Sequence, residues 1–362
     1  MIDWDLAVSA ATRMAGPGPT ISRAEAEATV AELRAGAERS TPLVREFTGL
    51  HAEERTAPVL VVDRRGWVQA NADGFAQVLA PLVEKLQTKK GTPSPAAQAV
   101  GSRVTGLEVG ALLGFMSSKV LGQFDPFYGI DPAESPTGST KGYAAEAPAG
   151  RLLLVAPNIV HAEREMNVDP TDFRLWVCLH EETHRVQFTA VPWMASHIHS
   201  QIEGLVADIE VDPAKLASMV GEGAKRIGEV LRGNDDTSLL ELFASEQQRE
   251  VLDRVTAVMS LLEGHADVVM DGVGPEVIPS VAAIRRRFNE RRKGTSHVDR
   301  VIRRLLGLDA KMAQYRDGAA FVRGTIDQVG MDGFNAVWAE PANVPTRPEI
   351  SDPEAWVRRV HG

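Results

Sequence analysis

Apolar residues recur at spacings of three and four between positions 170 and 189, which is the period of an amphipathic helix. The side chains that mark this stripe are Phe173, Trp176, Val177, Val186 and Phe188. Asp169 followed by Pro170 is typical of a helix start, because Asp caps free N–H groups and Pro fits the first turn. Pro192 lies just past the last apolar position. The pattern predicts a helix from about residue 170 to residue 189.

A second helical pattern covers residues 246–271. Its apolar positions are Val251, Val255, Val258, Leu262, Ala266 and Val269. Most of the chain after residue 195 has the same period, whereas short apolar runs at 59–62 and 152–155 indicate strands. Residues 126–150 are rich in Pro, Gly, Ser and Thr and are typical of a loop or insertion. We therefore expect a mainly α fold with a few short strands near the 170–189 helix.

The sequence His180-Glu181-Glu182-Thr183-His184 lies inside the first of these helices. Residues four apart share a helix face, so His180 and His184 can direct two imidazoles at one metal ion. Glu181 can flank that ion without binding it and take a proton from a water that the ion polarises. The alternative is a buried helix whose histidines bond to backbone carbonyls. The motif favours the core of a zinc hydrolase.

A catalytic zinc ion usually keeps three protein ligands and one open position. Glu263 and Asp267 lie four apart on the second helix, so one can bind the metal while the other accepts the N–H of a ligand imidazole. Glu263 is the preferred ligand and Asp267 the outer partner; the alternative for both is an ordinary solvated helix face. His265, on another face of that helix, is the alternative third ligand. The metzincin pattern requires Gly and His where this chain has Gln187 and Ala190, which excludes that class.

Two further residues bear on the chemistry. A hydrolase of this kind needs a donor that stabilises the tetrahedral oxyanion. Tyr315, one of three tyrosines, follows Glu263 on a later helix and is the candidate; a core or rim position is the alternative. Cys178 is the single cysteine, so no intrachain disulfide can form, and we interpret it as a small buried apolar residue.

The charge of the chain narrows the choice of partners. With 39 basic and 49 acidic residues the net charge is −10, which argues against general nucleic-acid binding. A basic cluster from Arg285 to Arg304 is interpreted as a helical face paired with nearby acids, with a surface for an anionic ligand or partner as the alternative.

The start of the chain lacks the basic and apolar segments of a signal peptide. The longest apolar stretch, residues 109–118, is too short to span a bilayer. We therefore expect a cytoplasmic protein that acts on a peptide or protein substrate and binds neither membranes nor nucleic acid.

The metal motif and the segment from Glu263 to Asp267 resemble a zincin-like metallopeptidase or hydrolase family common in actinobacteria, with members labelled as associated with deazaflavin-cofactor biosynthesis. The resemblance covers most of the chain and includes residues 11–19, 42–50, 59–67, 121–125 and 152–158. It implies a mostly helical zincin-like fold with a zinc site. By analogy with zincin-like folds, the 152–155 strand would line the cleft and pair with extended substrate. The chain departs from thermolysin-like enzymes in one respect. About 79 residues separate His184 from Glu263, far more than the short spacer usual there, which bears on the identity of the third ligand.

The patterns predict an N-terminal helical region (1–125), the loop or insertion (126–150), a metal-binding zincin-like region (151–340) and a C-terminal tail (341–362), with one compact domain as the alternative. The predicted function is a zinc-dependent hydrolase, in first place a metallopeptidase, in which His180, His184 and Glu263 bind the metal and Glu181 is the general base. The alternative function is a non-catalytic zincin-like binding or scaffold module.

Overall fold

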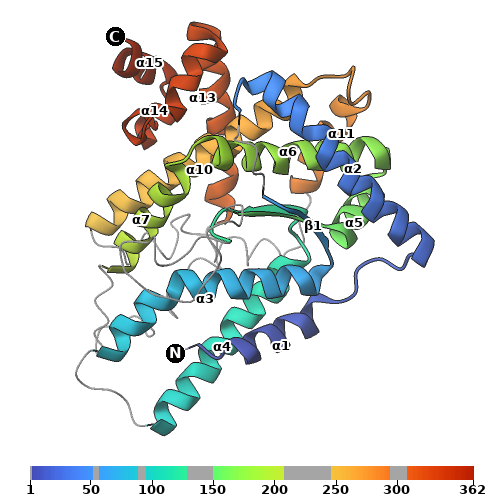
Figure 1. Ribbon diagram of the computed structural model, residues 1–362, viewed down its shortest axis with the longest axis vertical. Helices are drawn as coiled ribbons and strands as arrows, with labels where there is room; N and C mark the ends of the chain where they lie inside the picture. Colours follow the sequence, from blue (N-terminus) through green and yellow to red (C-terminus); the bar gives the residue numbers. More distant parts are fainter. Residues whose placement is uncertain (1, 52–56, 89–94, 129–149, 208–245, 294–307) are drawn as a thin grey trace. The chain divides into compact units, whose positions relative to one another are not determined.

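The computed structural model describes residues 2–51, 57–88, 95–128, 150–207, 246–293 and 308–362 (Figure 1). Helices make up most of this part of the chain, and three short strands form one sheet within it. The predicted fold class, mainly α with a few short strands, is confirmed.

The described elements include the two predicted strands and the two predicted helices, together with others that were not predicted. The elements up to residue 190 are α1 (Trp4–Ala15), α2 (Arg23–Thr48), β1 (Val59–Val62), α3 (Arg64–Thr88), α4 (Pro95–Ser117), β2 (Gly122–Asp125), β3 (Arg151–Val155), α5 (Ala156–Met166) and α6 (Pro170–Ala190). The later ones are α7 (Met194–Ala207), α10 (Glu246–Gly272), α11 (Val281–Lys293), α13 (Leu308–Phe334), the 3-10 helices η1 (Asn335–Trp338) and η2 (Pro341–Asn343), α14 (Arg347–Ile350) and α15 (Pro353–His361). The two helices predicted at 170–189 and 246–271, now α6 and α10, are both confirmed.

Contacts divide the chain into two compact units. One consists of Met1–Ala190 with Gly272–Ile284, and the other of Val191–Asp271 with Arg285–Gly362. The boundaries predicted at residues 125, 150 and 340 remain predictions, and most of the predicted loop or insertion lies outside the described residues. No helix in the described part of the chain is both long enough and apolar enough to cross a membrane.

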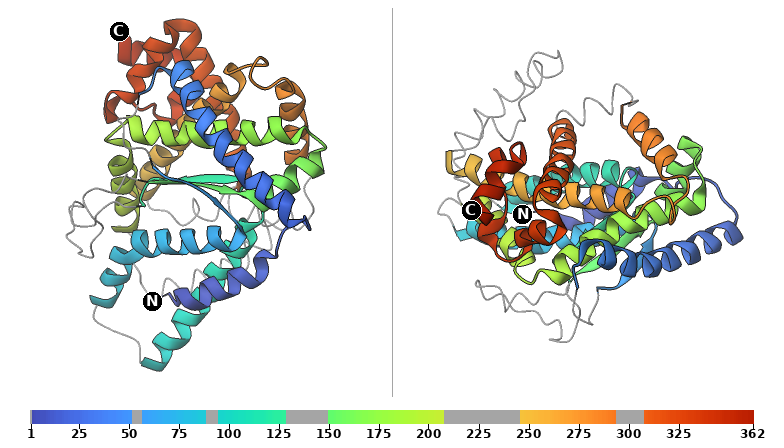
Figure 2. Two further views of the ribbon diagram at one scale, coloured as in Figure 1. Left: turned by 45° about the vertical axis from the view of Figure 1, so that its right-hand side comes forward. Right: turned by 90° about the horizontal axis from the view of Figure 1, so that it is seen from above.

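The sheet of the first unit has the strand order β1-β3-β2. Strand β3 pairs in parallel with β1 and in antiparallel with β2, and all five of its residues are buried. Figure 2 shows α2 and α6 on one side of the sheet and α1, α3 and α4 on the other. Because both edges of β3 are already paired, its backbone cannot hold an extended substrate. The substrate-pairing role expected of residues 152–155 is therefore wrong.

Segments of the first unit that are distant in sequence join through polar contacts that are buried or partly buried. Arg64 donates to Asn158 Oδ1 at 2.7 Å and to the carbonyl of Ala15 at 2.8 Å. Asn158 in turn donates to the carbonyls of Ser117 and Val120, at 2.7 and 2.6 Å. These bonds connect the ends of α1 and α4 to the start of α5 through the start of α3. The end of α1 is thereby linked to the start of α5.

Helices α1 and α4 pack against each other through glycines of α4. A Cβ built on Gly110 would lie 2.7 Å from the carbonyl oxygen of Ala7 and 2.9 Å from Cβ of Ala10. Gly101, on the same helix, has no heavy atom within 4 Å of the corresponding position. The close approach of the two helices thus depends on the missing side chain at particular positions.

We predict that Gly110→Ala lowers the free energy of unfolding by about 1–3 kcal/mol, because the added methyl group overpacks the α1–α4 contact. Gly101→Ala is the matched control and should be neutral or stabilising by up to roughly 1 kcal/mol, since alanine favours helix and the site is open. Urea unfolding of both variants checks the prediction. Equal stability of the two variants would contradict it.

Candidate metal centre

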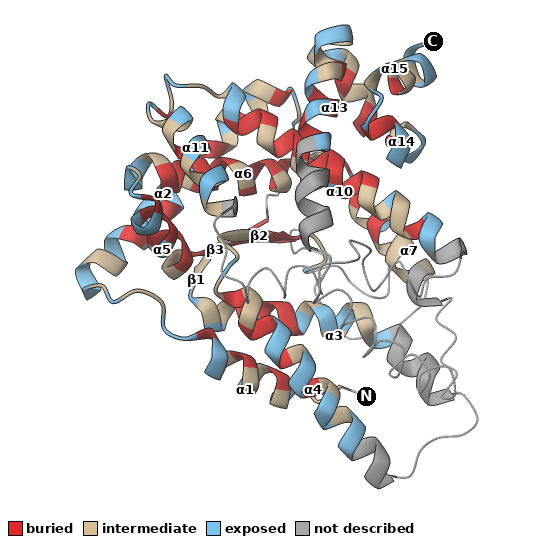
Figure 3. Ribbon diagram, turned by 180° about the vertical axis from the view of Figure 1, so that it is seen from behind, coloured by how far each residue is buried: buried red, intermediate tan, exposed pale blue. Residues whose placement is uncertain are grey.

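Helix α6 carries the metal motif and begins as the sequence predicts. The backbone N–H of Asp172 donates to Asp169 Oδ1 at 3.0 Å, so Asp169 caps the helix. The helix packs against α2 and the sheet, and Figure 3 shows buried residues along most of it. A helix enclosed to this degree holds its side chains in few rotamers, which suits a site that needs fixed geometry.

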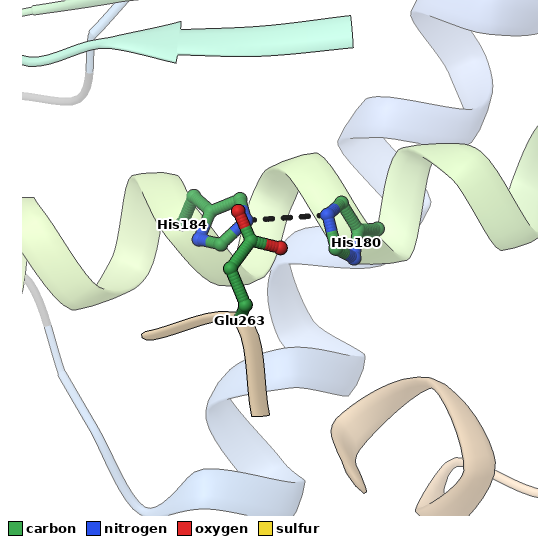
Figure 4. A group of neighbouring side chains, drawn as sticks. All are labelled: His180, His184 and Glu263. Carbon is green, nitrogen blue, oxygen red and sulfur yellow. Dashed lines mark hydrogen bonds between the residues drawn. The ribbon is translucent and has the colours of Figure 1, made fainter. Parts of the chain in front are cut away.

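The two histidines of the motif point toward each other from successive turns of α6. His180 Nε2 and His184 Nε2 are 3.2 Å apart, and the rings are nearly perpendicular, at 88° (Figure 4). Two nitrogens bound to one tetrahedral zinc ion at about 2.0–2.1 Å would be roughly 3.3–3.4 Å apart. The pair therefore already has the spacing of two ligands on a single zinc ion.

Glu263 on α10 completes a set of three possible ligands. One ligand atom each from His180, His184 and Glu263 all lie within 4.8 Å of one another, and the three side chains are half-buried (Figure 4). Two imidazoles and one carboxylate are a donor set that catalytic zinc sites use, with a fourth position left for water. The residues present thus fit a zinc ion.

The alternative third ligand, His265, has a different environment. Its ring is fully buried, with its centroid 5.4 Å from the ring of Phe334 and 5.2 Å from that of Trp338. The possible metal-binding group in the described part of the chain includes Glu263 and not His265. The structure therefore favours Glu263 of the two candidates.

Asp267 forms an ion pair with Arg285, which also pairs with Asp271 at 2.9 Å. Its predicted contact with a ligand imidazole remains a prediction. Arg285 is the first residue of the predicted basic cluster, and its pairing agrees with the interpretation of that cluster as a helical face paired with acids. Arg300, Arg303 and Arg304 lie outside the described residues. Tyr315 lies in α13, but its side chain is outside the described part, so its predicted role is untested.

Sequence reasoning missed Gln187 as a partner of the site. Its Oε1 lies 2.9 Å from His184 Nδ1, and its side chain is fully buried. An amide oxygen can only accept, so this contact places the imidazole proton on Nδ1 and leaves the lone pair of Nε2 for a metal. The spacing of three residues on one helix could have indicated the contact.

Glu182, which follows Glu181 in the motif, forms an ion pair that holds α6 against its neighbours. Glu182 has no exposed surface and accepts two hydrogen bonds from Arg185, at 2.7 and 2.8 Å. Arg185 also donates to the carbonyl of Ala57 and to Thr41 Oγ1, both at 2.9 Å. Burial raises the pKa of Glu182, while the hydrogen bonds from Arg185 oppose that rise. The pair therefore joins the metal helix to α2 and to the chain just before β1.

Cys178 behaves as predicted. It is fully buried, its thiol lies 3.5 Å from the carbonyl of Leu33, and burial raises its pKa far above the usual range. A thiol held protonated in this way is neither a nucleophile nor a ready metal ligand.

The fold is mainly helical with a possible metal-binding group of two histidines and a glutamate, and comparison with known proteins gives its family. The chain belongs to the zincin-like metallopeptidase family, whose model matches residues 2–357. This membership confirms the zincin-like part of the predicted resemblance and implies a metal, usually zinc. No curated protein matches the chain.

A solved structure is similar over the whole chain. It is the crystal structure of a "putative hydrolase with a novel fold" from Chloroflexus aurantiacus, with 28% sequence identity and a TM-score of 0.68. The similarity covers 100% of this chain and 99% of that one. The hydrolase description of this relative agrees with the family assignment.

We predict that Gln187→Leu weakens zinc binding by about 10–100-fold, the usual effect of removing an outer hydrogen-bond partner of a ligand histidine. Gln187→Glu keeps an acceptor at the same position and should bind zinc at least as tightly as the parent. Competition with a chromogenic chelator measures both affinities. Parent-like affinity in the leucine variant would show that Gln187 does not orient His184.

Proposed function

We propose that this protein is a zinc-dependent hydrolase that cleaves peptide bonds. The observation that carries the proposal is the group formed by His180, His184 and Glu263, three possible ligands of the type and number found at catalytic zinc sites. A zinc ion held there would polarise a water molecule and lower its pKa to about 7. Glu181, adjacent to a ligand in sequence, is proposed as the general base.

The environment of Glu181 supports this assignment. The residue is only 6% exposed, so its carboxylate works in a region of reduced water content, where electrostatic interactions are stronger. It takes the proton of the attacking water and then gives it to the leaving amine. Tyr315 is proposed, from the sequence alone, as the donor that stabilises the oxyanion.

A peptide or protein substrate is proposed from the family's description as metallopeptidases. Within the described sheet β2 is an edge strand, because it pairs only with β3. An edge strand offers unpaired backbone groups to an extended chain. Strand β1 is the other edge strand, but β2 is the one that lies against Glu181, so β2 is proposed to hold the peptide. The link to deazaflavin biosynthesis and the cytoplasmic location remain predictions from the sequence alone.

The second candidate function is a non-catalytic module that uses the same scaffold to bind a partner. A structural zinc ion would usually be closed by four protein ligands, and the group in the described residues has three. A structural site would also have no need of a carboxylate at Glu181. Both points favour the catalytic function, and the coordination sphere of the zinc-loaded protein discriminates between the two.

Glu181→Gln should keep its zinc and lose turnover by about 10²–10⁴-fold, since an amide cannot accept the proton but has the shape of the carboxylate. Metal analysis of protein purified without added metal, followed by cleavage assays on a peptide library, provides the measurement. Hydrolysis of a verified substrate at the parent rate would exclude Glu181 as the base.

Glu263→Ala should weaken zinc binding by more than about 100-fold. Loss of a residue that only contacts a metal ligand costs at most about 100-fold, and loss of a ligand itself should cost more. Glu250→Ala, which removes an exposed carboxylate from the same helix, is the matched control and should leave the affinity unchanged. Unchanged affinity in Glu263→Ala would mean that another residue is the third ligand.

A further inference from the structure

The proposed base lies directly against a glycine of the edge strand β2. A Cβ built on Gly122 would be 2.5 Å from Cγ of Glu181, 2.6 Å from Cδ and 2.7 Å from Oε1. Carbon atoms in favourable contact are about 3.5–4.0 Å apart. Even the smallest side chain at position 122 would therefore force either the Glu181 carboxylate or the strand to move.

Backbone conformation does not explain the glycine. Gly122 is absent from the described glycines with positive φ, so its conformation is open to other residues. A glycine also weakens a strand, because it adds backbone entropy to the unfolded chain and contributes no packing. What remains is the space that the missing side chain leaves for Glu181.

Strand β2 meets α6 at a second point as well. Side chains alternate along a strand, so Phe124 lies on the same face as Gly122. The ring of Phe124 packs 5.4 Å from the ring of Phe188, two helical turns beyond Glu181. Two contacts along α6 determine how far the strand lies from the base.

The opposite face of β2 is held by polar contacts. Trp67 Nε1 donates to Gln123 Oε1 at 2.9 Å, and Gln123 Nε2 donates to Asn71 Oδ1 at 3.0 Å. Asp125 is buried and accepts from Arg151 at 3.1 Å. Pairing with the buried strand β3 adds a fixed register, with Gly122 opposite Leu154. The strand therefore cannot retreat easily from an added methyl group.

We propose that Gly122 is a positioning residue for the reaction: its backbone limits the Glu181 carboxylate on one side and fixes the place from which it takes and returns a proton. The inference rests on the proposed function. Gly122 acts only through Glu181. The three atoms nearest to a Cβ at this position all belong to Glu181.

The test substitutes Gly122→Ala in the full-length protein loaded with zinc. We expect kcat to fall by about 100-fold, the effect of misplacing a catalytic group by about 1 Å, with little change in KM. Zinc affinity should stay within about threefold of the parent. Gly204→Ala is the matched control, because no heavy atom lies within 4 Å of its Cβ position, and it should leave kcat unchanged.

A second readout needs neither metal nor activity. The readout is a double-mutant cycle in the zinc-free protein. It measures how much Gly122→Ala lowers the free energy of unfolding, once in the parent and once in the Glu181→Ala background. The three Glu181 atoms nearest to the new methyl group are missing in that background. We expect the cost to fall to less than half. If Gly122→Ala alone does not fold, the double variant should.

A parent-like kcat in Gly122→Ala, an additive cycle, or a failure of both the single and the double variant to fold would each overturn the proposal. Equal costs of Gly122→Ala in the two backgrounds would overturn the role of Gly122 even if Glu181→Gln abolishes turnover. Parent-rate hydrolysis by Glu181→Gln would instead remove the proposed function, while the coupling between positions 122 and 181 would still be measurable. The two failures are thus distinguishable.

Discussion

Helix α6 has to be buried on most of its surface and still present two imidazoles to one point. The Glu182–Arg185 ion pair makes this possible. Both side chains are almost fully buried, and Arg185 bonds to α2 and to the chain before β1 as well as to Glu182. Loss of one partner of such a pair leaves an uncompensated buried charge, so the orientation of the helix is strongly specified. The rest of the site depends on that orientation.

Two of the polar side chains that the proposed site requires each have a supporting contact of their own. Gln187 holds the proton of His184 at Nδ1, and Gly122 leaves just enough room for Glu181. Gln187 lies one turn further along the same helix, whereas Gly122 lies in a strand about 60 residues earlier in the chain. Sites that must act with precise geometry commonly rest on such supporting contacts, because a rotamer is only as well fixed as the atoms around it.

The sheet illustrates where sequence reasoning succeeds and where it fails. The apolar runs at 59–62 and 152–155 predicted two strands correctly, because short β-branched or apolar runs favour extended, buried backbone. The strand at Gly122–Asp125 was not predicted, since it is short, begins with glycine and carries two polar residues. The substrate role was consequently assigned to 152–155, a strand that proves to be central and paired on both edges. Strand order is a long-range property, and a local pattern does not contain it.

The sequence by itself determined the helix from Asp169, the shared face of His180 and His184, and the candidate base between them, because helical geometry makes these local consequences of spacing. It also left two candidates, Glu263 and His265, for the third ligand. The tertiary structure places His265 in an aromatic core, and the possible metal-binding group in the described residues contains Glu263, which is why Glu263 is the proposed ligand. The physical reason is that a metal site needs atoms within a few ångströms of one point, and only the folded chain decides which face of a distant helix supplies them.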